Sequence, residues 1–423
     1  MSRIDTKCVT AGYEPENGQA GALPIYQSTT FKYDSGDTLG ALFDLKIGGH
    51  FYTRLSNPTN EAVEKKLNEL EGGVGAMVTS AGQAASLIAV TNIASAGDHI
   101  ISAAAIYGGT FNLFDVTLRK LGIETTFVDV NISAEELNSL VRDNTKLIFG
   151  ETLTNPALDV LEIEKFAKVA HDNKIPLIVD NTFPTPALCR PFEFGADIVT
   201  HSTSKYLDGH AVSLGGAIVD SGNFDWEKSG KFPGLTTPDE SYHGVVYTKT
   251  FGKAAYITKA RVQLMRDLGA QMSPFNAFLL NMNMQTLCVR MEKHCKNAQR
   301  IAEFLEANDK IAWVNYRGLK SNKYYELAQK YLPDGQAGVI SFGVKGGKEA
   351  SKKFMEALKH CVMEIHVADI KTCCLHPAST THRQMSDEQL LECGVSPDLI
   401  RMSIGIENAD DIIEDITQAL EKV

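Results

Sequence analysis

Lys205 and the two serines before it are the residues of this chain that are best placed to do chemistry. Residues 198–200 (Ile-Val-Thr) predict a short buried strand, and Ser202, Ser204 and Lys205 follow it closely. A lysine amine can condense with an aldehyde to a Schiff base, while serine hydroxyls and backbone N–H groups can hold a phosphate. The pattern therefore indicates a site for a ligand that carries both a carbonyl group and a phosphate.

A carboxylate at the end of another apolar run adds a further part of such a site. Residues 177–180 (Leu-Ile-Val-Asp) predict a strand that ends at Asp180. A carboxylate in this place can pair with a protonated ring nitrogen, as in sites for pyridoxal phosphate. A solvated lysine and a turn-forming aspartate are the ordinary alternatives for each residue alone. The conjunction of Asp180 with Lys205 favours the cofactor site.

Two further positions are suited to bind anions. Residues 76–79 predict a buried strand, and a helix follows to about residue 94, so the N–H groups of Gly82 and Gln83 lie at a helix N-terminus. Arg401 interrupts the apolar run 399–406. A cation in a buried strand is costly unless an anion pairs with it, so either a structural carboxylate or the carboxylate of a substrate must accompany Arg401.

The order of the predicted elements indicates an α/β fold. Between residues 61 and 250, helices alternate with short apolar runs, which predicts a mostly parallel sheet covered on both faces. Residues 251–423 predict a smaller C-terminal α+β domain. Tyr107 and Asn155 each follow a predicted strand end, where open sheets place their ligand crevices. A structural tyrosine and a turn-forming asparagine are the alternatives for these two residues.

The composition limits the classes of partner. The chain has 423 residues, a formal charge of -11 and a pI near 5.5, which argues against nucleic acid or an anionic membrane as the main partner. The start lacks an apolar signal core, and no apolar run approaches the roughly 18 residues of a membrane span. The eight cysteines include no CxxC, so we expect reduced thiols and a cytoplasmic location.

Three other kinds of catalytic site are not predicted. The histidines considered as metal ligands lack a His-Glu-x-x-His spacing and do not cluster with cysteines; they are His201, His210, His376 and His382. There is no Gly-x-Ser-x-Gly elbow for a nucleophilic serine. A dinucleotide site lacks its Gly-x-Gly-x-x-Gly loop after the first predicted strand.

The stretch 197–206 resembles the lysine signature of the Cys/Met-metabolism family of pyridoxal-phosphate enzymes, and residues 401–407 are similar to its Arg-x-Ser-x-Gly-x-Glu motif. The family usually has threonine at the position of Ser204 and serine at the position of Ala81. The hydroxyl is kept at the first position, and backbone donors bind at the second. The resemblance implies the pyridoxal-phosphate transferase fold type I, with a large, mostly parallel seven-stranded sheet domain and a smaller C-terminal α+β domain.

The resemblance also implies a role for each candidate residue. Lys205, Tyr107 and Asp180 are implied to be catalytic, and Tyr107 is implied to stack on the cofactor ring and to accept a proton from the incoming amine. The residues implied to bind pyridoxal 5'-phosphate are Lys205, Asp180, Tyr107, Gly82, Gln83, Ser202, Ser204, Tyr52 and Arg54. Arg401 is implied to bind the substrate carboxylate, with Asn155 close to it.

Residues 1–60 predict an irregular arm that docks on a partner subunit, because an arm of this length has no core pattern of its own. Tyr52 and Arg54 lie there in the run Tyr-x-Arg-x-x-Asn-Pro-Thr. They resemble the family pair that reaches the cofactor phosphate of the other subunit, a role that suits the planar fork of arginine. The resemblance implies a homotetramer built from two active dimers, with residues 61–250 as the cofactor-binding domain.

Longer runs resemble one group within the family, the O-acetylhomoserine sulfhydrylases. They are residues 41–45, 107–110, 241–244, 260–263, 266–270 and 375–382. This implies a γ-replacement in methionine and cysteine metabolism, in which O-acetyl-L-homoserine and sulfide give L-homocysteine and acetate. The sequence leaves open the preferred sulfur nucleophile and the acyl group that departs.

Other functions remain as alternatives at this point. Methionine γ-lyase is disfavoured because it usually carries cysteine at the position of Gly109, whereas cystathionine γ-synthase and γ-lyase use the same cofactor site. A scaffold that binds the cofactor without catalysis is a further alternative, although it would not need Lys205, Asp180 and Arg401 together. Arg383 could bias the choice of acceptor, but no physical argument decides how.

Overall fold

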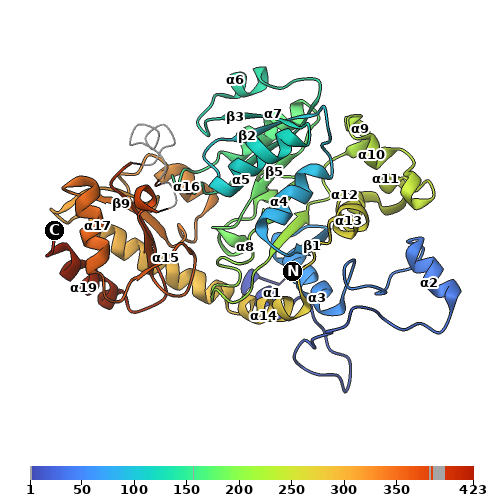
Figure 1. Ribbon diagram of the computed structural model, residues 1–423, viewed down its shortest axis with the longest axis horizontal. Helices are drawn as coiled ribbons and strands as arrows, with labels where there is room; N and C mark the ends of the chain where they lie inside the picture. Colours follow the sequence, from blue (N-terminus) through green and yellow to red (C-terminus); the bar gives the residue numbers. More distant parts are fainter. Residues whose placement is uncertain (1, 156, 381–382, 384–395) are drawn as a thin grey trace.

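The computed structural model describes residues 2–155, 157–380, 383 and 396–423, and it contains two sheets arranged along the long axis of the molecule (Figure 1). The larger sheet has seven strands in the order β1-β7-β6-β5-β4-β2-β3. They are β1 (Gly75–Thr79), β2 (His99–Ala103), β3 (Glu124–Val128), β4 (Thr145–Glu151), β5 (Leu177–Asp180), β6 (Ile198–His201) and β7 (Gly216–Asp220). β7 is antiparallel to both of its neighbours and the other pairs are parallel. The predicted large and mostly parallel sheet is confirmed.

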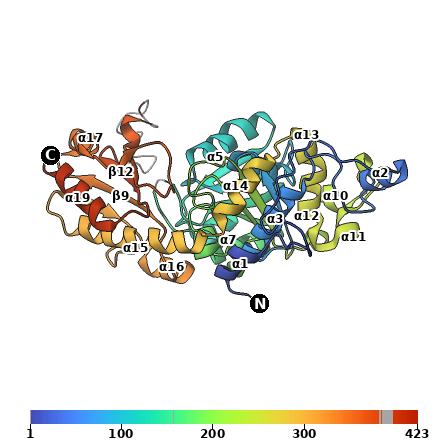
Figure 2. The ribbon, with the colours of Figure 1, turned by 90° about the horizontal axis from the view of Figure 1, so that it is seen from below.

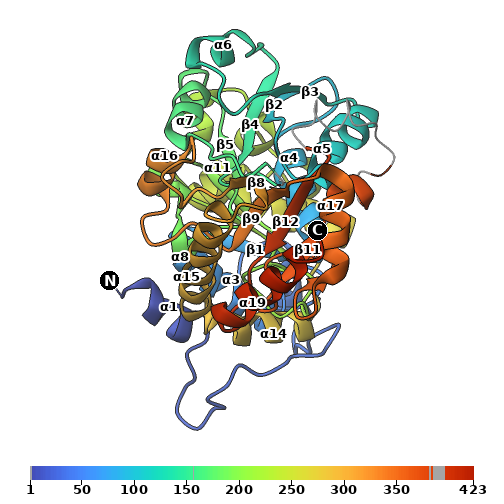
Figure 3. The same cartoon turned by 90° about the vertical axis from the view of Figure 1, so that its left-hand side faces the viewer.

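Helices cover both faces of this sheet, with α4 and α5 on one side and α7 on the other (Figure 3). The helices around it are α3 (Pro58–Glu71), α4 (Gly82–Thr91), α5 (Gly108–Asn112), the π-helical continuation η1 (Leu113–Leu118), α6 (Ala134–Ser139), α7 (Ile163–Asp172), α8 (Thr185–Leu188) and η2 (Pro191–Phe194). All side chains of β2, β6 and β7 are buried, as expected where both faces of a sheet are covered.

Local signals fix where two of these helices begin and end. Ser133 and Glu136 form a capping box at the start of α6. Helix α3 begins at Pro58, directly after the N-cap Asn57, whose side chain accepts a hydrogen bond from the N–H of Thr59. It ends at a glycine in the left-handed region, Gly72, with φ 82°.

The smaller sheet has five strands in the order β10-β11-β12-β9-β8. They are β8 (Ile311–Asn315), β9 (Val339–Val344), β10 (Val362–Met363), β11 (Cys373–Leu375) and β12 (Leu399–Ser403), and the accompanying helices are α15 (Leu287–Glu306), α16 (Tyr325–Tyr331), α17 (Gly347–Ala357), η6 (Pro377–Ser379) and α19 (Ala409–Leu420). Helix α15 runs from the larger body into the smaller one (Figure 2). The two sheets fall within the predicted segments 61–250 and 251–423, whose boundaries stay predictions.

The N-terminal arm is less irregular than the sequence predicts. Helix α1 (Ile4–Thr10) packs on α3 and α15 through the buried Cys8, and helix α2 (Gly36–Phe43) forms where Ser35 caps its first turn. The rest of residues 11–57 is mostly extended or turn-like, and the segment with α2 projects away from the body (Figure 1).

The long helical segments after residue 254 are not uniform. Residues 274–306 are divided into α14 (Pro274–Met284) and α15, with Gln285 and Thr286 between them. Residues 255–268 are continuously helical, with the π-helical η5 (Ala260–Met265) between α12 (Ala255–Lys259) and α13 (Arg266–Leu268). The apolar periodicity continues across Gln285 and Thr286, so the pattern does not reveal the break between α14 and α15.

The segment that follows β7 contains several short helices. They are α9 (Trp226–Ser229), α10 (Pro233–Thr236), η3 (Glu240–Tyr242) and α11 (Tyr247–Phe251), followed by η4 (Gly252–Ala254). Among the described residues, no helix has both the length and the apolar character to cross a membrane. The same part of the chain has no group of three or more His, Cys, Asp or Glu residues that could hold a metal ion. Position 382, one of the histidines considered above, lies outside the described residues.

Candidate active site

Three parallel strands of the large sheet end at one edge and place polar residues there. β4 ends at Glu151, β5 at Asp180 and β6 at His201. Glu151 is the register partner of Asp180, and Asp180 is the register partner of Thr200. The loop after β6 then carries Ser202 to Lys205. The carboxyl edge of the sheet is where open parallel sheets bind ligands, so the topology brings these residues together.

Lys205 is partly buried, and its amine has no carboxylate partner among the described residues. Its Nζ lies 3.4 Å from Nδ1 of His366, and no ion pair joins it to an acid in the part of the chain that the structure describes. Burial, reinforced by the charge of Arg401, lowers the pKa of the Lys205 amine below its usual value. A lower pKa increases the fraction of neutral amine, which is the form that attacks a carbonyl carbon.

Asp180 is partly buried and accepts hydrogen bonds from two threonines. The N–H of Thr182 donates to Oδ1 over 2.9 Å, and the hydroxyl of Thr200 donates to Oδ2 over 3.2 Å. Burial raises the pKa of the Asp180 carboxyl, and the hydrogen bonds with Thr182 and the charge of His201 oppose that rise. A protonated ring nitrogen would supply the opposite charge that this carboxylate lacks, so the site fits a pyridine ring.

Glu151 is a buried acid of this site that the sequence analysis did not single out. Its Oε1 accepts a hydrogen bond of 2.7 Å from the N–H of Tyr107. Burial, together with the neighbouring Asp180, raises the pKa of Glu151 well above its usual value. Glu151 therefore fixes the turn from which the half-exposed ring of Tyr107 projects. Its position at a strand end, like that of Asp180, was the signal that could have revealed it.

The N-terminus of α4 forms a cradle with the loop after β6. A Cβ atom on Gly82 would lie 2.7 Å from Cβ of Ser202, so only glycine permits this close approach. No side chain caps the first turn of α4, which leaves the N–H groups of Gly82 and Gln83 available to an anion. The amide side chain of Gln83 donates to Thr110 over 2.9 Å, so the backbone N–H is the group of Gln83 that stays available to an anion.

The two serines before Lys205 differ in their contacts. The hydroxyl of Ser204 donates to the carbonyl of Gly215 over 3.2 Å and accepts from the N–H of Gly215 over 2.9 Å. These bonds hold the loop against the start of β7. Ser202 instead lies against Gly82, at the cradle, and its N–H donates to the hydroxyl of Thr182 over 2.8 Å. The hydroxyl of Ser202 is therefore better placed than that of Ser204 to bind a phosphate.

Arg401 lies on β12 and is buried beside neutral acceptors. Its guanidinium donates to Oδ1 of Asn155 over 3.2 Å and to the carbonyl of Ile365 over 3.0 Å. Burial lowers the pKa of Arg401. Within the described ranges no carboxylate forms an ion pair with it, so the structural carboxylate considered above has no support. A buried cation of this kind favours an anionic ligand, and the carboxylate of an amino acid matches its planar fork.

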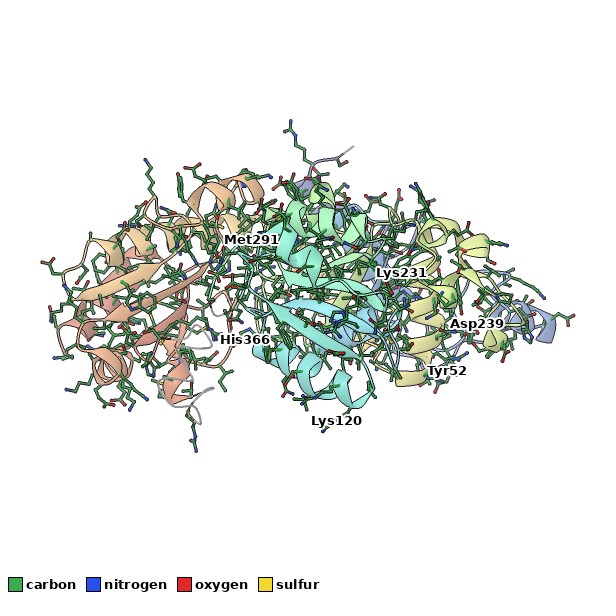
Figure 4. All side chains as sticks on the ribbon, turned by 90° about the horizontal axis from the view of Figure 1, so that it is seen from above. Tyr52, Lys120, Lys231, Asp239, Met291 and His366 are labelled. Atoms are coloured by element: carbon green, nitrogen blue, oxygen red, sulfur yellow. The ribbon has the colours of Figure 1, made fainter. Side chains whose placement is uncertain are left out.

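Tyr52 and Arg54 are not brought to Lys205 within one chain. They line a separate hollow of about 240 Å³ together with Pro274 and residues 27–29. The guanidinium of Arg54 lies 5.0 Å from the centre of the Tyr52 ring. In Figure 4, Tyr52 lies far from His366, the residue that contacts Lys205.

Comparison with known proteins agrees with this geometry. The family model described as Cys/Met metabolism PLP-dependent enzyme matches residues 5–421. The chain belongs to this family. It is therefore a pyridoxal-phosphate-dependent enzyme of Cys/Met metabolism, and the resemblance stated from the lysine signature is confirmed. When bound, pyridoxal phosphate supplies a ring that accepts negative charge from Cα of an amino acid.

Relatives in the Cys/Met-metabolism family match along the whole chain. Homocysteine synthase of Schizosaccharomyces pombe is 45% identical over 421 residues, covering 99% of this chain and 98% of that protein. O-acetyl-L-homoserine sulfhydrylase of Leptospira meyeri is 43% identical over 429 residues, covering 99% and 97%. A Campylobacter jejuni protein described as an O-acetylhomoserine (thiol)-lyase has a TM-score of 0.95 and 37% identity, covering 99% and 100%. Its crystal structure carries N'-pyridoxyl-lysine-5'-monophosphate at position 205.

Proposed function

We propose that this enzyme is an O-acetyl-L-homoserine sulfhydrylase, which replaces acetate by sulfide at Cγ and produces L-homocysteine. The observation that carries the proposal is the full-length match to homocysteine synthases and O-acetyl-L-homoserine sulfhydrylases in a chain where Lys205 follows the sheet edge that carries Asp180 and lies close to Arg401. The amine, the carboxylate and the unpaired buried cation are what an amino-acid substrate of this family requires.

The side chains divide the work as follows. Arg401 and Asn155 hold the substrate carboxylate, which orients the Cα–H bond toward Lys205. The Lys205 amine removes a proton at Cα, moves protons at Cβ and returns them after sulfide has added. Asp180 keeps the ring nitrogen protonated. Tyr107, held by Glu151, accepts the proton of the incoming amino group.

The competing reactions differ in their products. The holoenzyme incubated with O-acetyl-L-homoserine should form homocysteine from sulfide faster than cystathionine from cysteine. Faster cystathionine formation would support a cystathionine γ-synthase instead, and 2-oxobutanoate from methionine alone would indicate a lyase. One observation disfavours methionine γ-lyase: a Cβ atom at Gly109 would lie 2.5 Å from Cε1 of Tyr107, so a cysteine there would displace this ring.

Substitution of Asp180 tests the role of its carboxylate. We expect Asp180→Asn to lower kcat about 100-fold, because a neutral amide cannot balance a protonated ring nitrogen in a buried site. The steady-state rate of homocysteine formation measures this, with the bound cofactor quantified by its visible absorbance. Asp410→Asn, which removes a surface partner of Arg300, is the control. A variant Asp180→Asn with full cofactor content and unchanged kcat would contradict the assignment.

The arm supports an active dimer. Tyr52 and Arg54 lie on a projecting segment, away from Lys205 of the same chain, and a phosphate held in the cradle of another subunit would give both residues a ligand. We infer that two chains build each pair of sites and that two such dimers form the tetramer. The location of the enzyme in the cytoplasm stays a prediction from its composition.

Mixing of inactive subunits tests the shared site. We expect Arg54→Ala and Lys205→Ala subunits, dissociated and reassociated in equal amounts, to regain about a quarter of the wild-type activity, since half of the dimers would hold one intact site of two. Homocysteine formation before and after mixing is the measurement. Native mass spectrometry of the mixture controls for subunit exchange, because the two variant subunits differ in mass. If the hybrids stay inactive, Arg54 does not serve the neighbouring site.

A further inference from the structure

His366 contacts the Lys205 amine, although no sequence motif marks it. It lies between β10 and β11, and Figure 4 places it where the smaller body faces the larger one. Its Nδ1 is 3.4 Å from Nζ of Lys205. Its main-chain carbonyl accepts from the guanidinium of Arg401 over 3.5 Å and from the thiol of Cys373 over 3.2 Å. The backbone is thus fixed on β11 and β12 while the ring faces the amine.

The hydrogen-bonding capacity of the ring decides its tautomer. When the Lys205 amine is protonated it has donors only, so Nδ1 of His366 then accepts from it and the ring proton lies on Nε2. Nε2 is buried and has no hydrogen-bond partner among the side-chain and backbone atoms of the described residues. A buried donor without an acceptor is unfavourable, so the ring holds an N–H group that a bound ligand would complete.

The surroundings keep this imidazole neutral. Burial is the largest cause that lowers the pKa of His366, and the positive charge of Lys205 adds to it. The acidic groups that oppose the shift are Asp369, Glu364 and Asp208. Arg401 and Cys373 also face this region through their contacts with the His366 carbonyl. A neutral ring next to a basic amine can both accept and donate a proton.

The position of the ring indicates which substrate atoms it meets. Arg401 and Asn155 already serve the carboxylate, whereas the amine beside His366 serves Cα and Cβ. The His366 ring thus contacts the amine that would move the protons of Cβ, the carbon next to Cγ. This step rests on the sulfhydrylase function proposed above.

We propose that His366 relays protons between Lys205 and the group that leaves or joins Cγ. In the elimination half, Lys205 takes the Cβ proton and passes a proton to Nδ1, while Nε2–H protonates the departing oxygen as the Cγ–O bond breaks, so acetic acid leaves. In the addition half, hydrogen sulfide gives a proton to Nε2 as its sulfur bonds to Cγ, and the Nδ1 proton returns through Lys205 to Cβ. The ring changes tautomer twice and ends unchanged, and no oxidant is needed.

A change of leaving group tests the relay directly. Chloride departs without a proton, so the γ-chloro analogue of homoserine bypasses the donor Nε2–H. We expect His366→Ala to lower kcat with O-acetyl-L-homoserine about 100-fold and with the chloro analogue only about 10-fold, where just the orientation of Lys205 is lost. KM for both substrates should change less than kcat. Equal losses with both substrates would overturn the relay.

A second readout does not depend on turnover. The pH at which the visible absorbance of the holoenzyme changes reports protonation at the Lys205 nitrogen. Loss of the acceptor Nδ1 in His366→Ala should lower the midpoint pH of this absorbance change. His366→Asn should recover part of the lost shift, since its amide oxygen can accept a hydrogen bond. In His366→Asn the fall of kcat at low pH that comes from the imidazolium should also vanish. An unchanged midpoint in His366→Ala would exclude the contact.

His99→Asn is the matched control. His99 is also buried and uncharged near neutral pH, because burial lowers its pKa to about 4, but both ring nitrogens are bonded to Thr145 and Thr126 at the other end of the sheet. His99→Asn should leave the midpoint pH unchanged, and also the ratio of kcat with O-acetyl-L-homoserine to kcat with the chloro analogue. The same shifts in this control would overturn the assignment to His366. Failure of the proposed function can be distinguished from failure of the His366 contact. If the enzyme is not a sulfhydrylase, the wild type forms no homocysteine, but His366→Ala still shifts the midpoint pH.

Discussion

Lys205→Ala is expected to lower kcat at least about 1,000-fold, the largest loss of any single substitution, because one amine both binds the cofactor aldehyde and moves the protons. The fold around it should survive, since its side chain makes one long hydrogen bond in the described structure, to His366. Lys205→Arg should be equally inactive, because a guanidinium keeps its proton at neutral pH. Homocysteine formation with sulfide is the assay, and circular dichroism checks the fold.

A surface lysine provides the comparison for this loss. Lys120 is exposed on the larger body (Figure 4), so Lys120→Ala should keep the wild-type kcat. A Lys205→Ala enzyme that keeps more than a tenth of the wild-type kcat would show that another group moves the protons.

Arg401→Gln is expected to lower kcat/KM about 100- to 1,000-fold. Truncation of one member of a buried charge pair costs about 3 to 4 kcal/mol, and each 1.4 kcal/mol is a factor of ten. Most of the loss should lie in KM, because the guanidinium binds the carboxylate throughout the reaction. Arg401→Lys should recover only part, since a point charge cannot replace the planar fork that also bonds Asn155.

Substrate analogues distinguish this role from a structural one. The wild-type enzyme should lose affinity for a substrate whose carboxylate is an amide, and Arg401→Gln should bind both forms with similar affinity. Arg300→Gln, which breaks a surface pair with Asp410, serves as the control. An Arg401→Gln enzyme that still prefers the carboxylate by the wild-type factor would place the carboxylate elsewhere.

The sequence predicted the parts of the site that local patterns encode. Asp180 ends an apolar strand, Lys205 follows the next one, and parallel strands bring their carboxyl ends to one edge, so their proximity followed from the pattern. Gly82 was predicted for its backbone, and its contact with Ser202 now explains why a glycine stands there. Arg401 was predicted because a cation in a buried strand needs an anion.

Other features depend on tertiary packing and left no local signal. His366 reaches Lys205 from a segment that is 161 residues away along the chain, so no spacing could reveal it. Ser204 was predicted to bind phosphate, whereas its hydroxyl pairs with Gly215, a partner that only the fold supplies. The break after α14 lies within continuous apolar periodicity, which reports a buried face but not a change of direction.

Borohydride reduction of the holoenzyme followed by peptide mass spectrometry tests the central claim most directly, because it fixes the cofactor to the amine that holds it. We expect a single modified peptide that contains Lys205, together with loss of the visible absorbance and of homocysteine formation. A modified peptide that carries another lysine, such as Lys259, or full reduction with Lys205 unmodified, would contradict the account.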